Sequence, residues 1–438
     1  MSLDEATSLR SNGAIFDFYI LILFMSKQEI ISGIDLGSAN IRVIIVERGG
    51  LEDKPRILGI GESPSFGIRK GAIVDAEEIV TSISSALEKA ERMAGSPVGR
   101  AYVSVGGAQI SYLESRGVIA ISRADGEISK NDVSRVIEAA SAVSISSNRE
   151  ILHILPRDFI VDDEGGIKDP VGMNGVRLEA VTTIVETSSS LLNNLTRCVE
   201  RTGVDVAGLV FAPLASAWSV LEKRQRDLGV VLIDLGGGST SFSVYEEGGL
   251  LSGGALPVGG EHISSDLAIG LRTSMDTAER VKIEYGSCLP HEIDKQEEID
   301  LAKVVKKEKG VISRREVAEI IEARGEEIFK MIDKELHKIG RSAQLPAGAV
   351  LVGGGAKLPG VVDLAKEILR LPAQIGFPMG LSISVDKVDD PVFATATGLI
   401  HWGLGEGNRF SFEFNREGLT KLNSGMDRMK RWFKNFLP

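Results

Sequence analysis

The chain has 438 residues, 43% of them hydrophobic and 25% charged, enough to bury a sizeable core and to form more than one domain. Its formal net charge of −11 argues against a general nucleic-acid binder, because neutralising phosphates requires a clustered excess of Lys and Arg. The two cysteines, Cys198 and Cys288, are far apart, and the five histidines are scattered. Neither a disulfide framework nor a zinc site is predicted.

Near the N-terminus lies a short apolar run, FYILILFM at 18–25, which is preceded by acidic residues. It is shorter than the roughly 20 residues needed to span a bilayer, and it lacks the positive flank of a signal peptide. We interpret residues 1–27 as an N-terminal extension. An alternative is that Met25 is the biological start, because the first convincing strand follows it directly.

From Ile30 the pattern is α/β. IISGIDLG, IRVIIVE and PRILGIGES alternate or run apolar as strands do, Ala76–Ala94 has helical spacing, and AYVSVGG is again a strand. These elements predict the first part of a large domain at 28–107. After Gly107 the units become shorter, with a helix over Asn131–Ser144 between strand-like segments. This change predicts a small inserted α+β subdomain at 108–187.

The α/β alternation then resumes. Helices are expected over Leu191–Arg201 and Ala217–Lys223, which complete the first domain at 188–227. A second large domain at 228–385 begins with the apolar GVVLIDLGGGSTSFSVY, continues through a charge-rich helical stretch from Asp266 to about Lys338, and ends after a helix over Val361–Arg370. Residues 386–403 would return to the first domain, and 404–425 have the composition of a linker.

Three glycine turns follow strands, at 34–43, 232–244 and 350–360. Glycine lets successive backbone N–H groups turn inward as a nest for phosphate oxygens, and Ser and Thr hydroxyls add donors. Each turn alone is weak evidence, because GGG also occurs in simple hairpin bends. The first two have the form D-L-G about 200 residues apart, which indicates a duplicated domain with one loop on each side of a phosphate chain. Neither a Walker A lysine nor GxGxxG stands in the right context.

These three segments resemble the phosphate 1, phosphate 2 and adenosine motifs of the actin, Hsp70 and sugar-kinase superfamily. The resemblance implies an actin-like fold with ATP and Mg²⁺ in a central cleft, and Asp35 and Asp234 holding the metal through water. It places these residues at the nucleotide: Asp35, Gly37, Ser38, Asn40, Asp234, Gly236, Gly237, Gly238, Ser239, Thr240, Gly353, Gly354, Gly355 and Ala356.

The segment TAERVKIEYG matches the adenine and ribose side of the same superfamily. Glu279 and Lys282, three apart on one helical face, would contact ribose and base, and a surface ion pair is the alternative. One departure is Asn40, where many relatives carry Lys. Asn donates to phosphate without adding charge, so we expect at most weak ATPase activity.

Within the superfamily, ALPVGGEHISSDLAIGLRTSMDTAERVKIEYG and DPVGMNGVRLEA resemble the bacterial FtsA cell-division family, and the similarity runs from about Ile30 to about Gly403. It implies a tether between the tail of FtsZ and the cytoplasmic face of the membrane at the division site. It also implies self-association into actin-like filaments and contacts of the inserted subdomain with later division proteins. Arg314 matches a basic position that would face the acidic FtsZ tail. An exposed charged helix without a partner is the alternative.

The last thirteen residues form a basic amphipathic segment. On a helix at about 100° per residue, its apolar side chains fall within roughly a 140° arc, and four basic against one acidic residue give +3. This pattern predicts a helix at 426–438 lying on an anionic membrane surface, although packing on its own domain is the alternative. The membrane contacts would be Met426, Met429, Lys430, Arg431, Trp432, Phe433, Lys434, Phe436 and Leu437.

Other functions fit less well. A sugar kinase needs a carboxylate to accept a hydroxyl proton, and the connecting segment VFAPLASAWSVL offers none, so no catalytic residue is predicted. An Hsp70-type chaperone would continue into a peptide-binding domain, for which about 80 residues after Gly355 are too few. An FtsA-like pilus-assembly platform protein is the remaining alternative, and the terminal amphipathic segment argues against it.

Overall fold

The computed structural model describes residues 29–48, 54–306, 308–382 and 388–405. The N-terminal extension, nearly all of the linker at 404–425 and the amphipathic segment at 426–438 lie outside these ranges. Within them, no helix combines the length and the apolar composition that a bilayer span requires.

The first half is a five-stranded sheet covered by helices on both faces. Its elements are β1 (Ile30–Leu36), β2 (Asn40–Glu47), β3 (Arg56–Pro64), β6 (Arg100–Val105), β11 (Asp205–Phe211), α2 (Ala76–Ala94), α4 (Ser189–Glu200), α5 (Ala212–Val220) and α12 (Ala394–Gly403). The strand order is β11-β6-β1-β2-β3. Helix α2 packs on β2 and β3, while α12 packs on β1 and β6. Helix α2 has the predicted bounds, and it begins where Asp75 accepts two backbone N–H bonds as N-cap.

The second half repeats this plan. Its elements are α6 (Lys223–Leu228), which leads into it, β12 (Val230–Leu235), β13 (Thr240–Glu246), β14 (Gly249–Leu256), β17 (Ala349–Val352), β18 (Ala373–Ile375) and α11 (Val361–Leu369). Its order, β14-β13-β12-β17-β18, matches β3-β2-β1-β6-β11 strand for strand. In both sheets an antiparallel hairpin is followed by a parallel crossover. The predicted duplicated α/β fold is therefore confirmed.

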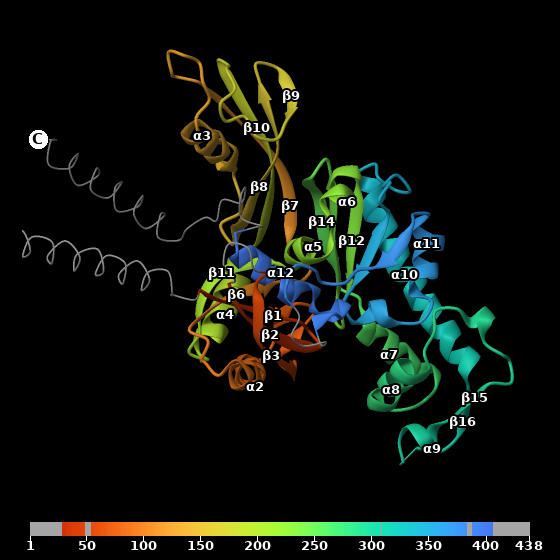
Figure 1. Ribbon diagram of the computed structural model, residues 1–438. Coiled ribbons are helices and arrows are strands. Elements are labelled where there is room, and N and C mark those ends of the chain that lie inside the picture. Colours follow the sequence, from red (N-terminus) through yellow and green to blue (C-terminus); the bar gives the residue numbers. More distant parts are fainter. Residues whose placement is uncertain (1–28, 49–53, 307, 383–387, 406–438) are drawn as a thin grey trace, which may run out of the picture.

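The segment expected to be helical from Asp266 to about Lys338 is interrupted. It comprises α7 (Gly260–Gly270), α8 (Met275–Tyr285), β15 (Glu298–Asp300), α9 (Leu301–Val304), β16 (Val311–Ser313) and α10 (Arg314–Lys338). The strands β15 and β16 pair as a two-stranded sheet, which the charged sequence concealed because each strand has only three residues. Figure 1 shows these elements gathered beside the second sheet.

The inserted unit projects from the first half as a separate layer (Figure 1). Its elements are β7 (Ser111–Ala120), α3 (Lys130–Ser141), β8 (Arg149–Val161), β9 (Glu164–Ile167) and β10 (Arg177–Ser188), in the antiparallel order β7-β10-β8-β9. Ser129 and Asp132 form a capping box at the start of α3. The helix covers one face of the sheet through its own buried cluster, which includes Ile137 and Phe159.

Helices α5 and α12 lie between the two sheets and position the cleft. The helix expected at Ala217–Lys223 starts five residues earlier, at Ala212, because Pro213 is favourable in a first helical turn. Along α5 almost every side chain is buried, since its two sides face different sheets. At Gly398 of α12 an added Cβ would lie 1.9 Å from the carbonyl oxygen of Ala215. Glycine therefore allows the two helices to cross closely.

Candidate functional site

The tips of the two D-L-G hairpins meet at one end of the space between the halves. The β1–β2 turn and the β12–β13 turn pack directly against each other: a Cβ added at Gly237 would lie 2.8 Å from Cβ of Ala39, and one at Gly238 would lie 2.9 Å from Cβ of Ser38. Side chains at these glycines would push the halves apart. The glycine turns thus bring two strands from distant parts of the sequence to one place.

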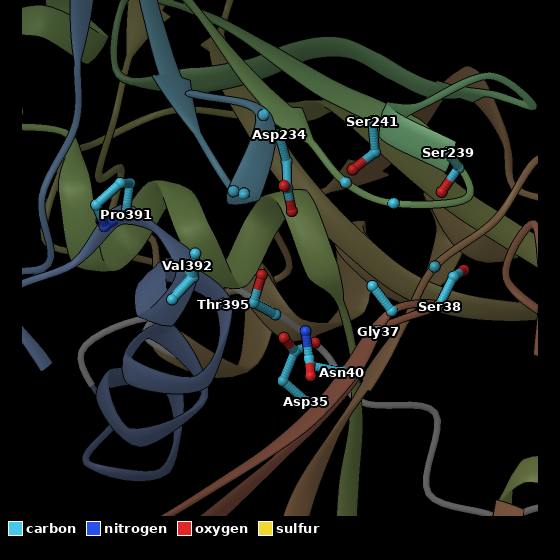
Figure 2. A pocket seen from close by; sticks show the side chains of 18 of the residues that line it. Asp35, Gly37, Ser38, Asn40, Asp234, Ser239, Ser241, Pro391, Val392 and Thr395 are labelled. Atoms are coloured by element: carbon cyan, nitrogen blue, oxygen red, sulfur yellow. The ribbon is translucent and has the colours of Figure 1, made fainter. Parts of the chain in front are cut away.

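Behind this contact the two halves enclose a cavity of about 500 Å³. In Figure 2 the side chains of Asp35 and Asp234 point into it from opposite sheets. This volume is large enough to hold a molecule of the size of a drug or a nucleotide. Thirteen of the residues proposed from sequence line it: Asp35, Gly37, Ser38, Asn40, Asp234, Gly236, Gly237, Ser239, Glu279, Lys282, Gly353, Gly354 and Gly355.

Three proposed residues do not line the cavity: Gly238, Thr240 and Ala356. Gly238 lies in the contact between the loops. Thr240 is fully buried, because side chains alternate along β13 and those of Ser239 and Ser241 face the cavity instead. Ala356 is also fully buried. The Thr240 side chain is therefore not positioned as a phosphate donor, which corrects the expectation from sequence.

Several lining residues were missed by the sequence reasoning. Arg42 and Ser241 each lie two residues beyond a residue proposed from sequence, Asn40 and Ser239, so strand alternation could have identified them. Val392 and Thr395 come from the segment that returns to the first half, and both are labelled in Figure 2 among the side chains that line the cavity. Nothing local in the sequence connects that segment with the glycine turns.

The two aspartates occupy equivalent positions in different environments. Burial raises the pKa of Asp35 above its ordinary value, and the Arg42 charge and a 2.8 Å hydrogen bond donated by Ser104 offset only part of this shift. Burial and the nearby Asp35 raise the pKa of Asp234 to about 7, and Arg42 opposes this shift. Two buried carboxyl groups at one cavity are costly in the charged form, so the site favours a cation between them.

The carboxyl pair suits magnesium held through water. In the part of the chain that the structure describes, no cluster of three or more His, Cys, Asp or Glu side chains could hold a metal by itself. Mg²⁺ commonly keeps several waters and binds through one or two carboxylates together with substrate phosphates. Asp35 and Asp234 supply that donor set, and the phosphates would have to supply the rest.

On the α8 side of the cavity, Glu279 and Lys282 form an internal cluster. The Lys282 Nζ donates to the carbonyl of Gly260 at 3.0 Å, to the hydroxyl of Ser264 at 2.9 Å and to Glu279 at 2.7 Å. An ammonium group has three donors, so all of them are used within the protein. The ion pair considered from sequence is present, although both residues also line the cavity.

Arg314 lies at the start of α10 and not at the cavity. Its Nε donates to the carbonyl of Tyr285 at 3.0 Å, and its Nη1 donates to Glu297 at 2.6 Å. The guanidinium therefore ties α10 to the end of α8. The proposed membrane contacts at 426–437 are outside the described residues.

Solved structures with the same architecture include a PilM–PilN type IV pilus biogenesis complex, with a TM-score of 0.58, 15% identity and coverage of 85% of this chain and 98% of that chain. MreB5 of Spiroplasma citri bound to ADP has a TM-score of 0.51, 14% identity and coverage of 86% and 97%. At these identities the likeness is one of fold alone. It agrees with the actin-like arrangement of the two halves.

Sequence comparison is more specific. A family model described as cell division protein FtsA matches residues 231–398, and a model described as the SHS2 domain inserted in FtsA matches residues 107–186. Cell division protein FtsA of Bacillus subtilis (strain 168) is 39% identical over 402 residues, covering 91% of this chain and 90% of that protein. The paired glycine hairpins, the inserted sheet and these matches agree, and the chain belongs to the FtsA family of bacterial cell-division proteins.

Proposed function

We propose that the cavity binds ATP with Mg²⁺ and that the nucleotide holds the two halves together. The observation that carries this proposal is the meeting of the two glycine hairpins, each with its aspartate, at one end of a 500 Å³ cavity. Backbone N–H groups of the two turns would cradle the phosphates, while Gly353, Gly354 and Gly355 would border the adenosine. The ADP in the MreB5 structure is in keeping with this use of the fold.

Within the cell the proposed role is that of a tether. Membership of the FtsA family supports an assembly that joins FtsZ polymers to the membrane at the division site, self-associates into filaments and recruits later division proteins through the inserted unit. The basic amphipathic composition of 426–438 supports attachment to the cytoplasmic face of an anionic membrane. We assign no catalytic base, so any hydrolysis would be slow. A pilus-assembly role is the alternative.

The proposed docking site for the acidic FtsZ tail includes Arg314. Its bond to Glu297 is partly exposed, and exposed ion pairs contribute little free energy. A peptide carboxylate could therefore replace Glu297 without a large cost. Arg314→Ala should weaken binding of an FtsZ tail peptide at least ~10-fold, or ~1.4 kcal/mol, whereas Arg315→Ala on the next position of α10 serves as the control.

The nucleotide site and the membrane tether are each tested by a separate experiment. Asp234→Ala should weaken binding of a fluorescent ATP analogue in MgCl₂ at least ~10-fold, because the metal loses one of its carboxylates; unchanged affinity would contradict the nucleotide site.

For the tether, the intact chain should pellet with anionic liposomes and a chain ending at Gly425 should not. Equal pelleting of the two chains would remove the membrane anchor and favour the pilus alternative.

A further inference from the structure

The charges around the cavity are unbalanced in a way that singles out one residue. Among the described residues that line it, three carry a fixed positive charge: Arg42, Lys282 and Lys357. The Lys282 ammonium is saturated by partners on α7 and α8, and the Lys357 ammonium lies 2.5 Å from Asp390. Asn40 is neutral. The positive charge facing the aspartates therefore comes from Arg42.

Strand pairing fixes where Arg42 lies. It is the direct partner of Asp35 across the β1–β2 hairpin, and on its other side it pairs with Glu62 of β3. Cross-strand partners project from the same face of a sheet. Its Nη2 lies 2.7 Å from Glu62, whose side chain is 45% exposed while that of Arg42 is 13% exposed. Glu62 thus holds the guanidinium from the solvent side.

The Arg42 guanidinium has one further contact and one donor that is not used. Its Nε is buried and has no hydrogen-bond partner, which is costly unless a ligand or water completes the site. Its central carbon also lies 5.5 Å from the ring centroid of Phe393, within cation–π range. The ring and Glu62 fix the orientation of the guanidinium, and the residue lines the cavity with one donor unused.

We propose that Arg42 is a built-in counter-charge that allows the polyphosphate of a nucleotide to enter the cleft without Mg²⁺. The inference rests on the proposed nucleotide site and adds to it a residue and an order of binding. Without Arg42, the anionic phosphates would meet two carboxyl groups with no facing cation, and binding would require the metal. With Arg42, nucleotide binds first and Mg²⁺ completes the site.

A counter-charge and a purely structural Arg42 predict different effects of Mg²⁺ on nucleotide binding. Removing the positive charge should weaken metal-free binding strongly, because the repulsion between phosphates and carboxylates is then uncompensated. It should also make Mg²⁺ bind more tightly, since the cavity becomes more negative. A loss of packing alone would weaken binding equally with and without metal.

The test measures binding of a fluorescent ATP analogue to the full chain in EDTA and in saturating MgCl₂. Arg42→Met, which keeps the length of the side chain, should weaken binding at least ~10-fold in EDTA and less than ~3-fold in MgCl₂, and its half-saturating Mg²⁺ concentration should fall. Arg42→Lys, which keeps the charge but loses the planar guanidinium, should lose clearly less affinity in EDTA than Arg42→Met does. Glu62→Gln, which removes the ion pair with Arg42 and keeps the Arg42 charge, should bind within ~3-fold of the wild type in both EDTA and MgCl₂.

The other possible binding results would each overturn a different part of the proposal. Equal losses in EDTA and MgCl₂, with a lower melting temperature, would assign Arg42 to structure and overturn the inference. A wild-type chain that binds the analogue only with Mg²⁺ would overturn it too, while leaving the nucleotide site in place. A wild-type chain that binds under neither condition would remove the proposed site itself.

Discussion

The two glycine hairpins are the same structure with different chemistry. Asp35 and Asp234 occupy equivalent strand ends, and the seventh residue after each is its cross-strand partner: Arg42 in the first hairpin and Ser241 in the second. Ser104 donates to the first aspartate, whereas the parallel strand beside the second pairs Val352 with it. The Arg42 charge acts on both carboxyl groups, but only Asp35 is its cross-strand partner and only Asp35 also accepts a hydroxyl hydrogen bond from Ser104.

This difference indicates a division of work between duplicated halves. In the first hairpin the Arg42 charge and the Ser104 hydroxyl offset part of the cost of burying Asp35 before any ligand arrives. The second carries a carboxyl group whose pKa burial and Asp35 raise to about 7, so its charge is stabilised only when a cation binds. Duplication explains the fold, and divergence at a few strand positions explains the asymmetry.

The largest effect on nucleotide binding is expected where the hairpins touch. Gly238→Val would place a branched side chain against Ser38 and the backbone of Lys70, where even a Cβ would lie 2.9 to 3.2 Å from their atoms. We expect at least ~100-fold weaker nucleotide binding, or ~2.7 kcal/mol, with both halves still folded. The measurement is titration with the fluorescent ATP analogue.

A matched control is Gly99→Val, because a Cβ at Gly99 meets no atom within 4 Å. It should bind as the wild type does. If Gly238→Val also binds normally, the two tips do not need to touch, and the comparison between the hairpins loses its geometric basis.

The largest effect on stability is expected from neutralising each aspartate without nucleotide or metal. Asp234→Asn should stabilise the folded protein by up to ~4 kcal/mol at pH 8, because it removes a buried charge that Arg42 only partly offsets. Asp35→Asn should give a smaller gain, since Arg42 and the Ser104 hydrogen bond offset part of the burial cost that raises the pKa of Asp35. Denaturant unfolding in EDTA measures both. Equal gains would mean that Arg42 does not distinguish the two sites.

The same contrast predicts a pH dependence. The pKa of Asp234 rises from an ordinary 3.8 to about 7 on folding, so the folded state binds this proton more tightly than the unfolded state does. Its contribution to stability is fully present below pH 3.8 and is lost as pH rises to 7, by up to ~1.4 kcal/mol per pH unit. The stability gain of Asp234→Asn should therefore grow from pH 5 to 7 and then level off. A constant gain would contradict the raised pKa.

The smallest expected effect concerns the supporting hydroxyl. Ser104 accepts the Leu36 N–H and donates to Asp35, each at 2.8 Å, so Ser104→Ala should cost ~1 kcal/mol of stability. Ser241→Ala in the second hairpin should cost less than ~0.5 kcal/mol. Thermal unfolding of the two variants, side by side, distinguishes them; a greater loss at Ser241 would reverse the assignment of the supported half.

Much of this arrangement could be predicted from the sequence, because the signals were local. The repeated D-L-G turns indicated the duplication, and the spacing of Ala76–Ala94 predicted α2. Thr240 was placed at the nucleotide with Ser239, but side chains alternate along a strand, and its own is buried while those of Ser239 and Ser241 line the cavity. Arg42 was missed because a charged residue in a strand is usually expected to face solvent. Its role also depends on Asp35, Glu62 and Phe393, which come from separate segments of the chain.

Nucleotide phosphates should lie between the two hairpins, and a crystal structure of the chain with Mg²⁺ and a non-hydrolysable ATP analogue would show this directly. We expect the phosphates between residues 37–40 and 236–239, with the metal on the side of Asp35 and Asp234 and the adenosine beside Gly354. A nucleotide bound elsewhere, or an empty cleft at saturating analogue, would contradict this expectation.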